Sequence, residues 1–357
     1  MQEAQKNAKK LKISLCLNHL RRSGGMLLIL FLSLAVMVIL AFLLSKNPER
    51  TLGFFFLGPI QNTYYFGNMI NSAIPLIFGG LGISIALQGN TFNLGGEGQI
   101  YLGAFVATIL AISLSFLGIF GGIIAFLVAA LISGLVAAIS ALLKTKWQTS
   151  ELITTFLISN AIILVVNYLV TGPFLDPETN LQSTRKIPDV LRMTPILAPS
   201  NLSSALFFAI FAVVFVYVFL YKTLTGYEIR ITGINEEFAK YGGINVTKNK
   251  ILPMFLSGMF FGIAGAFSIY GTYYATIKEF STGMGWNSFA VALIARSKPQ
   301  NIIPSAIFFA WIGSGARLAM QFSDITFEVS LIVQSVVFFL VSSSVLQNIF
   351  KQKRVKI

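Results

Sequence analysis

Apolar and polar stretches alternate along the whole chain. Ten apolar runs are separated by more polar segments, and the runs lie at 26–45, 67–87, 100–114, 119–143, 152–170, 202–221, 251–274, 286–295, 302–320 and 327–346. A helix needs about 20 apolar residues to cross a bilayer, so the short run 286–295 predicts a broken or tilted element. The pattern therefore predicts an all-α polytopic membrane protein with about ten transmembrane helices.

One interruption between two runs is unusually polar and rich in glycine. Residues 90–99 read Asn-Thr-Phe-Asn-Leu-Gly-Gly-Glu-Gly-Gln and stand between two apolar runs. Polar groups at membrane depth usually mark a transport pathway, and glycine lets an unwound backbone approach a solute. The alternative is that Asn93 and Glu97 only tie helices together by hydrogen bonds. We expect the segment to line a pathway, with its polar and aromatic candidates at Asn90, Phe92, Asn93, Glu97 and Gln99.

Glycine and proline patterns predict how some helices pack or break. Pro75 with the glycines at 79, 80 and 82 should weaken the second run midway. Gly118 and Gly122 offer a small-residue contact between helices, as do Gly258, Gly262 and Ala266. A loose echo of the 75–99 pattern at 253–285 suggests an inverted repeat with broken helices, although chance similarity accounts for it nearly as well.

The charged residues are few and unevenly placed. Charged residues make up 11% of the chain and hydrophobic ones 55%, a balance typical of a membrane protein. The net charge of +13 could suggest nucleic acid, but nineteen of the twenty-six lysines and arginines lie on the side of the runs that the positive-inside rule assigns to the cytoplasm. We therefore expect membrane lipid around the chain, no nucleic-acid partner, and both termini in the cytoplasm.

The same assignment divides the chain into segments. A basic cytoplasmic N-terminus occupies 1–25, the transmembrane domain 26–346, and a basic cytoplasmic tail 347–357. Within the domain we expect an outer loop at 48–65, a proline-rich external loop at 171–200 and a cytoplasmic loop at 222–250.

The cytoplasmic loop contains a short amphipathic helix. Asn235 is a good N-cap, Glu236 and Glu237 suit the first turn, and Gly242 is a natural stop. Such a helix could form a Glu236–Lys240 pair on one side. On another face lie Ile234, Phe238 and Tyr241, which would pack onto the domain, onto lipid, or into a groove of a partner.

Several chemistries are absent from the sequence. Cys16 and His19 are the only residues of their kinds, so we expect no disulfide, no zinc site and no bound metal or cofactor. No nucleotide-binding P-loop, Gly-x-Ser-x-Gly or His-Glu-x-x-His motif occurs. The chain is therefore predicted not to be an enzyme.

Three segments resemble one family. The segments 90–99, 233–245 and 285–295 are similar to motifs of ABC importer permeases of the ribose and branched-chain amino-acid type. Among these, the chain looks most like nucleoside permeases that work with basic membrane lipoprotein-type binding proteins. Asn287 stands where the family usually has aspartate, so the polar group survives but its charge does not, and Trp286 precedes it.

The resemblance implies a division of labour in a bacterial cytoplasmic (inner) membrane. An extracytoplasmic substrate-binding lipoprotein captures the solute, two permease subunits, identical or homologous, form the passage, and ABC ATPase subunits hydrolyse ATP. It also implies pathway roles for Trp286 and Asn287, and contact with the ATPase through the coupling residues Asn235, Glu236, Phe238, Ala239, Tyr241 and Gly242.

More than one interpretation remains for the solute that is carried and for the energy source that drives transport. A nucleoside is expected first, while riboflavin, a sugar or another small solute would fit the same machinery. From another class, an ion-coupled secondary transporter would use Glu97 as its coupling acid. A membrane scaffold is the third interpretation, in which the Phe238 face binds no ATPase.

Overall fold

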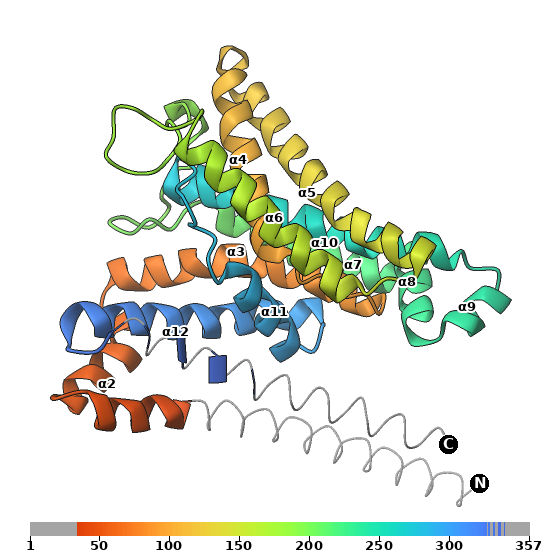
Figure 1. Ribbon diagram of the computed structural model, residues 1–357. Coiled ribbons are helices and arrows are strands. Elements are labelled where there is room, and N and C mark those ends of the chain that lie inside the picture. Colours follow the sequence, from red (N-terminus) through yellow and green to blue (C-terminus); the bar gives the residue numbers. More distant parts are fainter. Residues whose placement is uncertain (1–33, 327, 329–330, 333–334, 337–338, 340–357) are drawn as a thin grey trace, which may run out of the picture. The chain divides into compact units, whose positions relative to one another are not determined.

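The computed structural model of the chain describes residues 34–326, 328, 331–332, 335–336 and 339 (Figure 1). Within this part the secondary structure is helical, and extended pairing occurs only as the isolated bridges Leu175–Thr184, Ser183–Ile277 and Pro195–Ser203. The all-α prediction is therefore confirmed.

Seven helices of the described part are long and apolar enough to cross a membrane. They are α3 (Thr63–Gln88), α4 (Gly96–Ser113), α5 (Ile119–Trp147), α6 (Glu151–Thr171), α7 (Ala205–Lys222), α10 (Val246–Ser268) with the π-helical turn η4 (Ile269–Tyr273), and α12 (Ile302–Phe322) with the 3-10 turn η5 (Pro299–Asn301). Two further apolar helices are shorter, Leu34–Leu44 and α11 (Met284–Ile294). The prediction of a polytopic membrane protein is confirmed.

The number of ten spans is not confirmed. The predicted run 286–295 corresponds to α11, which has 11 residues and is short, as expected. The run 26–45 is described only from residue 34 onward, and most of the run 327–346 lies outside the described residues.

The remaining helices are short connections between the long ones. They are α2 (Pro48–Phe56), η1 (Gly58–Ile60), η2 (Ser115–Leu117), η3 (Asp189–Leu191), α8 (Leu224–Ile234) and α9 (Glu236–Tyr241). The expected outer loop at 48–65 is thus largely helical. Its helices have clear start signals, because Pro48 occupies the first helical position of α2 and the Asn62 side chain accepts a hydrogen bond from Tyr65 N at 2.8 Å at the start of α3.

The described residues belong to two compact units, which are described separately. One unit combines the chain up to Phe56 with the chain from Gly315 onward, and the other runs from Leu57 to Ser314. In the first unit Phe55 is fully buried, and Gly315 lies so close to the Phe55 carbonyl oxygen that a side chain there would clash with it.

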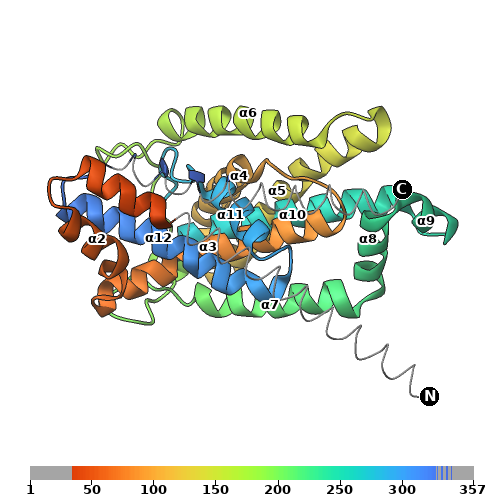
Figure 2. The same ribbon diagram turned by 90° about the horizontal axis from the view of Figure 1, so that it is seen from below.

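Helix α10 is the centre of the second unit. It packs against α3, α4 and α5, while α6 packs on α4 and α7 on α3. In Figure 2, α6 and α7 accordingly lie along opposite edges of this unit, with α3, α4, α10 and α11 between them. Large apolar side chains of α7 are exposed, Phe211 to 68% for example, as expected for a surface that faces lipid.

Glycines allow the close approach of α10 to its neighbours. A Cβ at Gly103 of α4 would lie 2.5 Å from the Cα of Gly262, and one at Gly258 would lie 2.6 Å from the Cβ of Ala137 in α5. The predicted small-residue face of α10 therefore packs on α5. The other predicted contact is wrong, because Gly118 caps α5 with φ of +55° and Gly122 packs against the side chain of Leu191.

Helix α3 is not broken at Pro75 or at its glycines. It continues as α-helix from Thr63 to Gln88, contrary to the expected weakening. The glycines serve close packing instead, since a Cβ at Gly79 would lie 2.9 Å from the Phe261 ring and one at Gly82 would lie 2.8 Å from Ser257 O. The helix therefore continues through the positions where its sequence favours a break, and there it is packed tightly against α10 and α11.

Candidate functional site

The glycine-rich segment links the end of α3 to the start of α4. The chain turns at Asn90, which has φ of +53° and is exposed. Thr91 then fixes the turn, because both its backbone N and its hydroxyl donate to Ala86 O at 3.0 Å. Residues 92–95 have no regular secondary structure, and α4 begins at Gly96.

Asn93 and Gln99 form a buried amide pair. The Asn93 Nδ2 donates to Gln99 Oε1 at 2.8 Å, and the Gln99 Nε2 donates back to Asn93 Oδ1 at 3.0 Å. Asn93 also donates to Ser257 Oγ of α10 at 3.0 Å and accepts from Gly95 N. Both side chains are at most 2% exposed. Their hydrogen-bonding groups therefore hold the segment to α10 and are not available to a solute in this conformation.

Hydroxyl groups of α6 hold the segment from the other side. Thr155 Oγ1 accepts from Leu94 N at 3.2 Å, and Ser159 Oγ accepts from Gly98 N at 2.8 Å. These residues lie four and eight positions into α6, which corresponds to about 6 and 12 Å along its axis. Gly98 has no room for a side chain, since a Cβ would lie 2.5 Å from Ser159 O. The segment and the start of α4 thus follow α6 for about one helical turn.

Glu97 joins the first turn of α4 to the start of α11. Its Oε1 accepts a hydrogen bond from Gly283 N, and Gly283 is the N-cap residue of α11 with φ of +80°. Gly285 lies against the same place, because a Cβ there would be 2.5 Å from Glu97 N. The carboxyl group is half-buried. Glu97 therefore anchors the short helix α11 to α4 at a helix N-terminus, where an acidic group is favourable.

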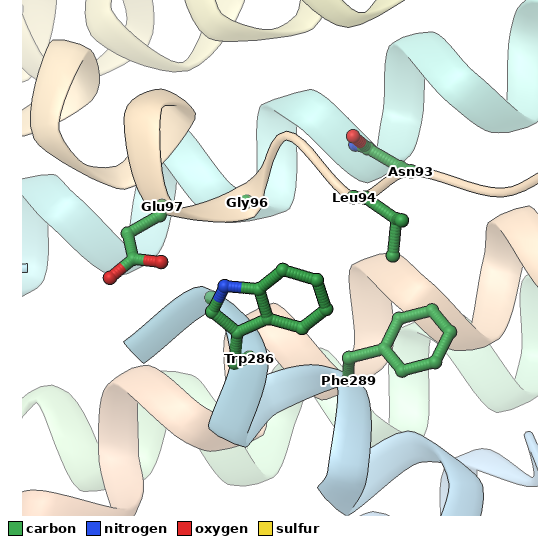
Figure 3. Close-up of a pocket in the computed structure, with 7 residues that line it drawn as sticks. Asn93, Leu94, Gly96, Glu97, Trp286 and Phe289 are labelled. Atoms are coloured by element: carbon green, nitrogen blue, oxygen red, sulfur yellow. The ribbon is translucent and has the colours of Figure 1, made fainter. Parts of the chain in front are cut away.

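A small cavity lies between the segment and α11. Its volume is about 10 Å³, room for about one water molecule. Figure 3 shows the side chains of Leu94 and Phe289 close to the Trp286 indole, with the Asn93 amide turned away from both rings. The cavity is lined by Asn93, Leu94, Gly96, Glu97, Gly285, Trp286 and Phe289. The cavity has no room for a ring-containing solute in this conformation.

The predicted pathway residues fall into two groups. Asn93, Glu97 and Trp286 line the cavity, whereas Gln99 is buried and is not part of the lining. The lining does not include Asn90, Phe92 or Asn287. Of these, Phe92 and Asn287 are half-buried.

Sequence reasoning missed several residues of this site. Leu94 and Phe289 line the cavity, and Thr155, Ser159 and Ser257 hold the segment in place. Glu151, Thr155 and Ser159 are spaced by four along α6 and are all buried, so this polar stripe on an apolar helix was the signal that could have found two of them.

The predicted coupling helix is α9. The Asn235 side chain caps it by accepting from Phe238 N at 3.1 Å, and Gly242 follows its last residue. Its expected apolar face is open, with Ile234 exposed to 73%, Phe238 to 63% and Tyr241 to 92%.

Two details of α9 differ from the predicted interactions. Glu236 forms an ion pair with Lys250 instead of Lys240, with 2.7 Å between Glu236 Oε1 and Lys250 Nζ. The start of α10 brings Lys250 to the first turn of α9. Ala239 is fully buried, so it supports the helix from beneath and does not belong to its outer surface.

No metal site is found in the part of the chain that the structure describes, where no three His, Cys, Asp or Glu side chains are placed to share an ion. A bundle of long apolar helices with a buried polar segment between two of them is typical of membrane transport proteins.

Comparison with known proteins gives the family. The model for the branched-chain amino acid transport system permease component matches residues 65–342. The chain belongs to this family of ABC transporter permeases. No solved structure matches it.

Curated relatives carry different solutes. A probable riboflavin import permease protein of Treponema pallidum is 32% identical over 313 residues, covering 87% of this chain and 83% of the relative. A glucose ABC transporter permease protein of Haloferax volcanii is 28% identical, covering 94% and 90%. A guanosine ABC transporter permease protein of Bacillus subtilis is 27% identical, covering 80% and 83%.

Proposed function

We propose that this chain is the membrane-spanning subunit of an ABC importer that carries a nucleoside-like solute into the cell. The solute path passes between the glycine-rich segment and α11. Energy comes from a separate ATPase that binds α9, and a second permease subunit and an extracytoplasmic binding lipoprotein complete the transporter. The loop 222–250 and both termini lie in the cytoplasm of a bacterial inner membrane.

The observation that carries the ATPase assignment is the open apolar face of α9. Phe238 and Tyr241 project from a short, capped helix that is fixed to α10 by the Glu236–Lys250 ion pair. Large exposed aromatic side chains on a rigid helix are typical of a surface that docks into a groove. Figure 1 supports the orientation, because α9 and the loop between α6 and α7 lie at opposite ends of the second unit.

The ring-shaped solute is inferred from the cavity lining and from the relatives. Trp286 and Phe289 supply aromatic faces, and Glu97 supplies a hydrogen-bonding group beside them. Such a combination suits a planar ring that carries polar substituents. Relatives named for guanosine and for riboflavin both match this description, and riboflavin is therefore the second candidate.

The test is a charge placed on the α9 face. With the Phe238→Asp variant, we expect the co-purifying ATPase to be lost and guanosine uptake by cells to fall at least about tenfold, because a buried unpaired carboxylate costs more than 1.4 kcal/mol in a hydrophobic groove. The control is Thr247→Asp, which adds the same charge at an exposed position of the same loop.

The measurements are ATPase activity and mass spectrometry of the purified complex, with uptake of labelled guanosine, riboflavin and glucose. Unchanged ATPase binding by the Phe238 variant would overturn the coupling assignment. Uptake of glucose alone would overturn the solute assignment.

A further inference from the structure

The end of α8 touches the turn that begins the glycine-rich segment. A Cβ at Gly233, in the last turn of α8, would overlap the carbonyl oxygen of Gln88 and lie 3.1 Å from Asn90 N. The two backbones are therefore in direct contact, without a side chain between them. A displacement of α8 toward α3 would therefore push directly on the backbone of the turn 88–90.

Helix α9 is joined to α8 by a single residue. Asn235 N donates to Ile231 O at 3.0 Å and so closes α8, while the Asn235 side chain opens α9. Arg230 fixes α8 to the end of α7, because its Nε donates to Leu220 O at 3.0 Å and its guanidinium lies 4.9 Å from the centre of the Tyr221 ring. The connection has no flexible linker that could absorb a movement of α9.

The turn 88–90 also reaches the far end of α11. Gln88 Nε2 donates to Ser297 O at 3.0 Å and lies 3.5 Å from the Tyr221 hydroxyl. Ser297 follows α11 by three residues, and its own N donates back to Ala292 O of that helix at 2.8 Å. The start of α11 is held by Glu97. The turn thus contacts the segment that follows α11, and along the chain it leads to Glu97, which holds the start of α11.

We propose that Gly233 and Gln88 are positioning residues that pass movement of α9 to the glycine-rich segment and to α11. This inference rests on the function proposed above. Gly233 provides the backbone contact on the α8 side, and Gln88 provides the side-chain link to the turn after α11. Neither residue needs to touch the solute or the ATPase.

The experiment measures how many solute molecules are moved per ATP hydrolysed. In proteoliposomes that contain the complete transporter, Gly233→Ala forces α8 and the turn apart by roughly 1 Å, because atoms resist such overlap. We expect ATPase binding and hydrolysis to remain while uptake per ATP falls about five- to tenfold, a usual size for coupling between sites. Gln88→Met, which keeps the length and loses the amide, should reduce the ratio in the same direction.

The controls separate coupling from folding. Gly53→Ala introduces the same methyl group where nothing lies within 4 Å, and should leave uptake per ATP unchanged. If Gly233→Ala does not fold, Gln88→Met decides the question. A normal ratio in Gln88→Met, or in both variants, would overturn the inference. An inactive wild-type complex would instead count against the proposed function.

Discussion

At the scale of residues, the amides and the acid of the glycine-rich segment serve structure first. Asn93 and Gln99 bond to each other, Asn93 also bonds to Ser257 of α10, and Glu97 bonds to Gly283. The sequence indicated that this segment is a polar, glycine-rich interruption with a role of its own. Of the two interpretations, the one in which polar residues tie helices together describes Asn93 and Gln99 in this conformation. The sequence could not indicate which residues accept hydrogen bonds from this segment, because Ser159 and Ser257 lie far away along the chain and look like ordinary helix residues.

Substitution of Glu97 separates its two candidate roles. Glu97→Ala removes the anchor of α11 and should destabilise the protein by about 1.5–3 kcal/mol, the usual contribution of a hydrogen bond to a charged group. Glu97→Gln keeps an acceptor oxygen, so we expect a smaller loss and retained uptake. Thermal unfolding in detergent and guanosine uptake are the measurements.

A loss of uptake without a loss of stability in Glu97→Gln would point to the other role. If Glu97→Gln unfolds like the wild type but abolishes uptake driven by a pH gradient, Glu97 is a coupling acid and the transporter is ion-driven. Matched loss of stability and uptake in both variants would contradict the hydrogen-bond account, because an amide oxygen can accept from Gly283 N.

At the scale of elements, glycine determines how closely helices approach, and its effect depends on the neighbour. The pattern at 79–82 predicted a break in α3, yet there these glycines make room for Phe261 and Ser257. The face at 258–266 was predicted as a contact, and it is one. Sequence spacing identifies helix faces made of small residues, but only the fold shows which neighbouring helix packs against each face.

A pair of alanine variants tests this packing. Gly103→Ala places a methyl group 2.5 Å from the Cα of Gly262, so we expect a loss of about 1–3 kcal/mol from overpacking. Gly53→Ala in α2 has free space around it and should stabilise by up to about 1 kcal/mol through its helix propensity. Thermal unfolding in detergent compares them, and equal shifts would mean that α4 and α10 are not in close contact.

At the scale of the whole molecule, the hydropathy pattern predicted a polytopic membrane protein, which is confirmed, and ten transmembrane helices, which is not. The seven long apolar runs that lie fully within the described residues do form long helices, because burial in lipid requires such runs. The segment 48–65 was mistaken for a loop because its Gly and Pro suggested one, and its capping residues were overlooked. The short run at 286–295 was correctly expected to be incomplete.

The pH dependence of stability is predicted from Asp324 in the first unit. Hydrogen bonds from the Ser45 hydroxyl and from Lys46 N, both at 2.6 Å, lower the pKa of Asp324 to about 2 from its ordinary value of 3.8. Because the folded pKa is the lower one, these bonds stabilise the fold above about pH 4 and are lost as the pH falls toward 2.

The measurement is the difference in melting temperature between wild type and Asp324→Asn in detergent. We expect the wild type to be more stable by a constant amount above about pH 5, and the difference to shrink between pH 4 and 2. A difference that does not change with pH in this range would show that the carboxyl group is not held by these bonds.

The contacts of α10 have a consequence for movement. Where Gly103 meets Gly262, and where Gly265 meets Ile100 O, main chains touch directly. Side chains can change rotamer to allow sliding, but here no side chains lie between the helices, so α4 and α10 must turn together as a stiff frame. Helix α11 is different, because hydrogen bonds of Glu97 and Gln88 hold it at its two ends. It also packs closely on α3, where Gly79 leaves no room for a side chain beside Ser288, so α11 moves only if those two hydrogen bonds and this packing open together.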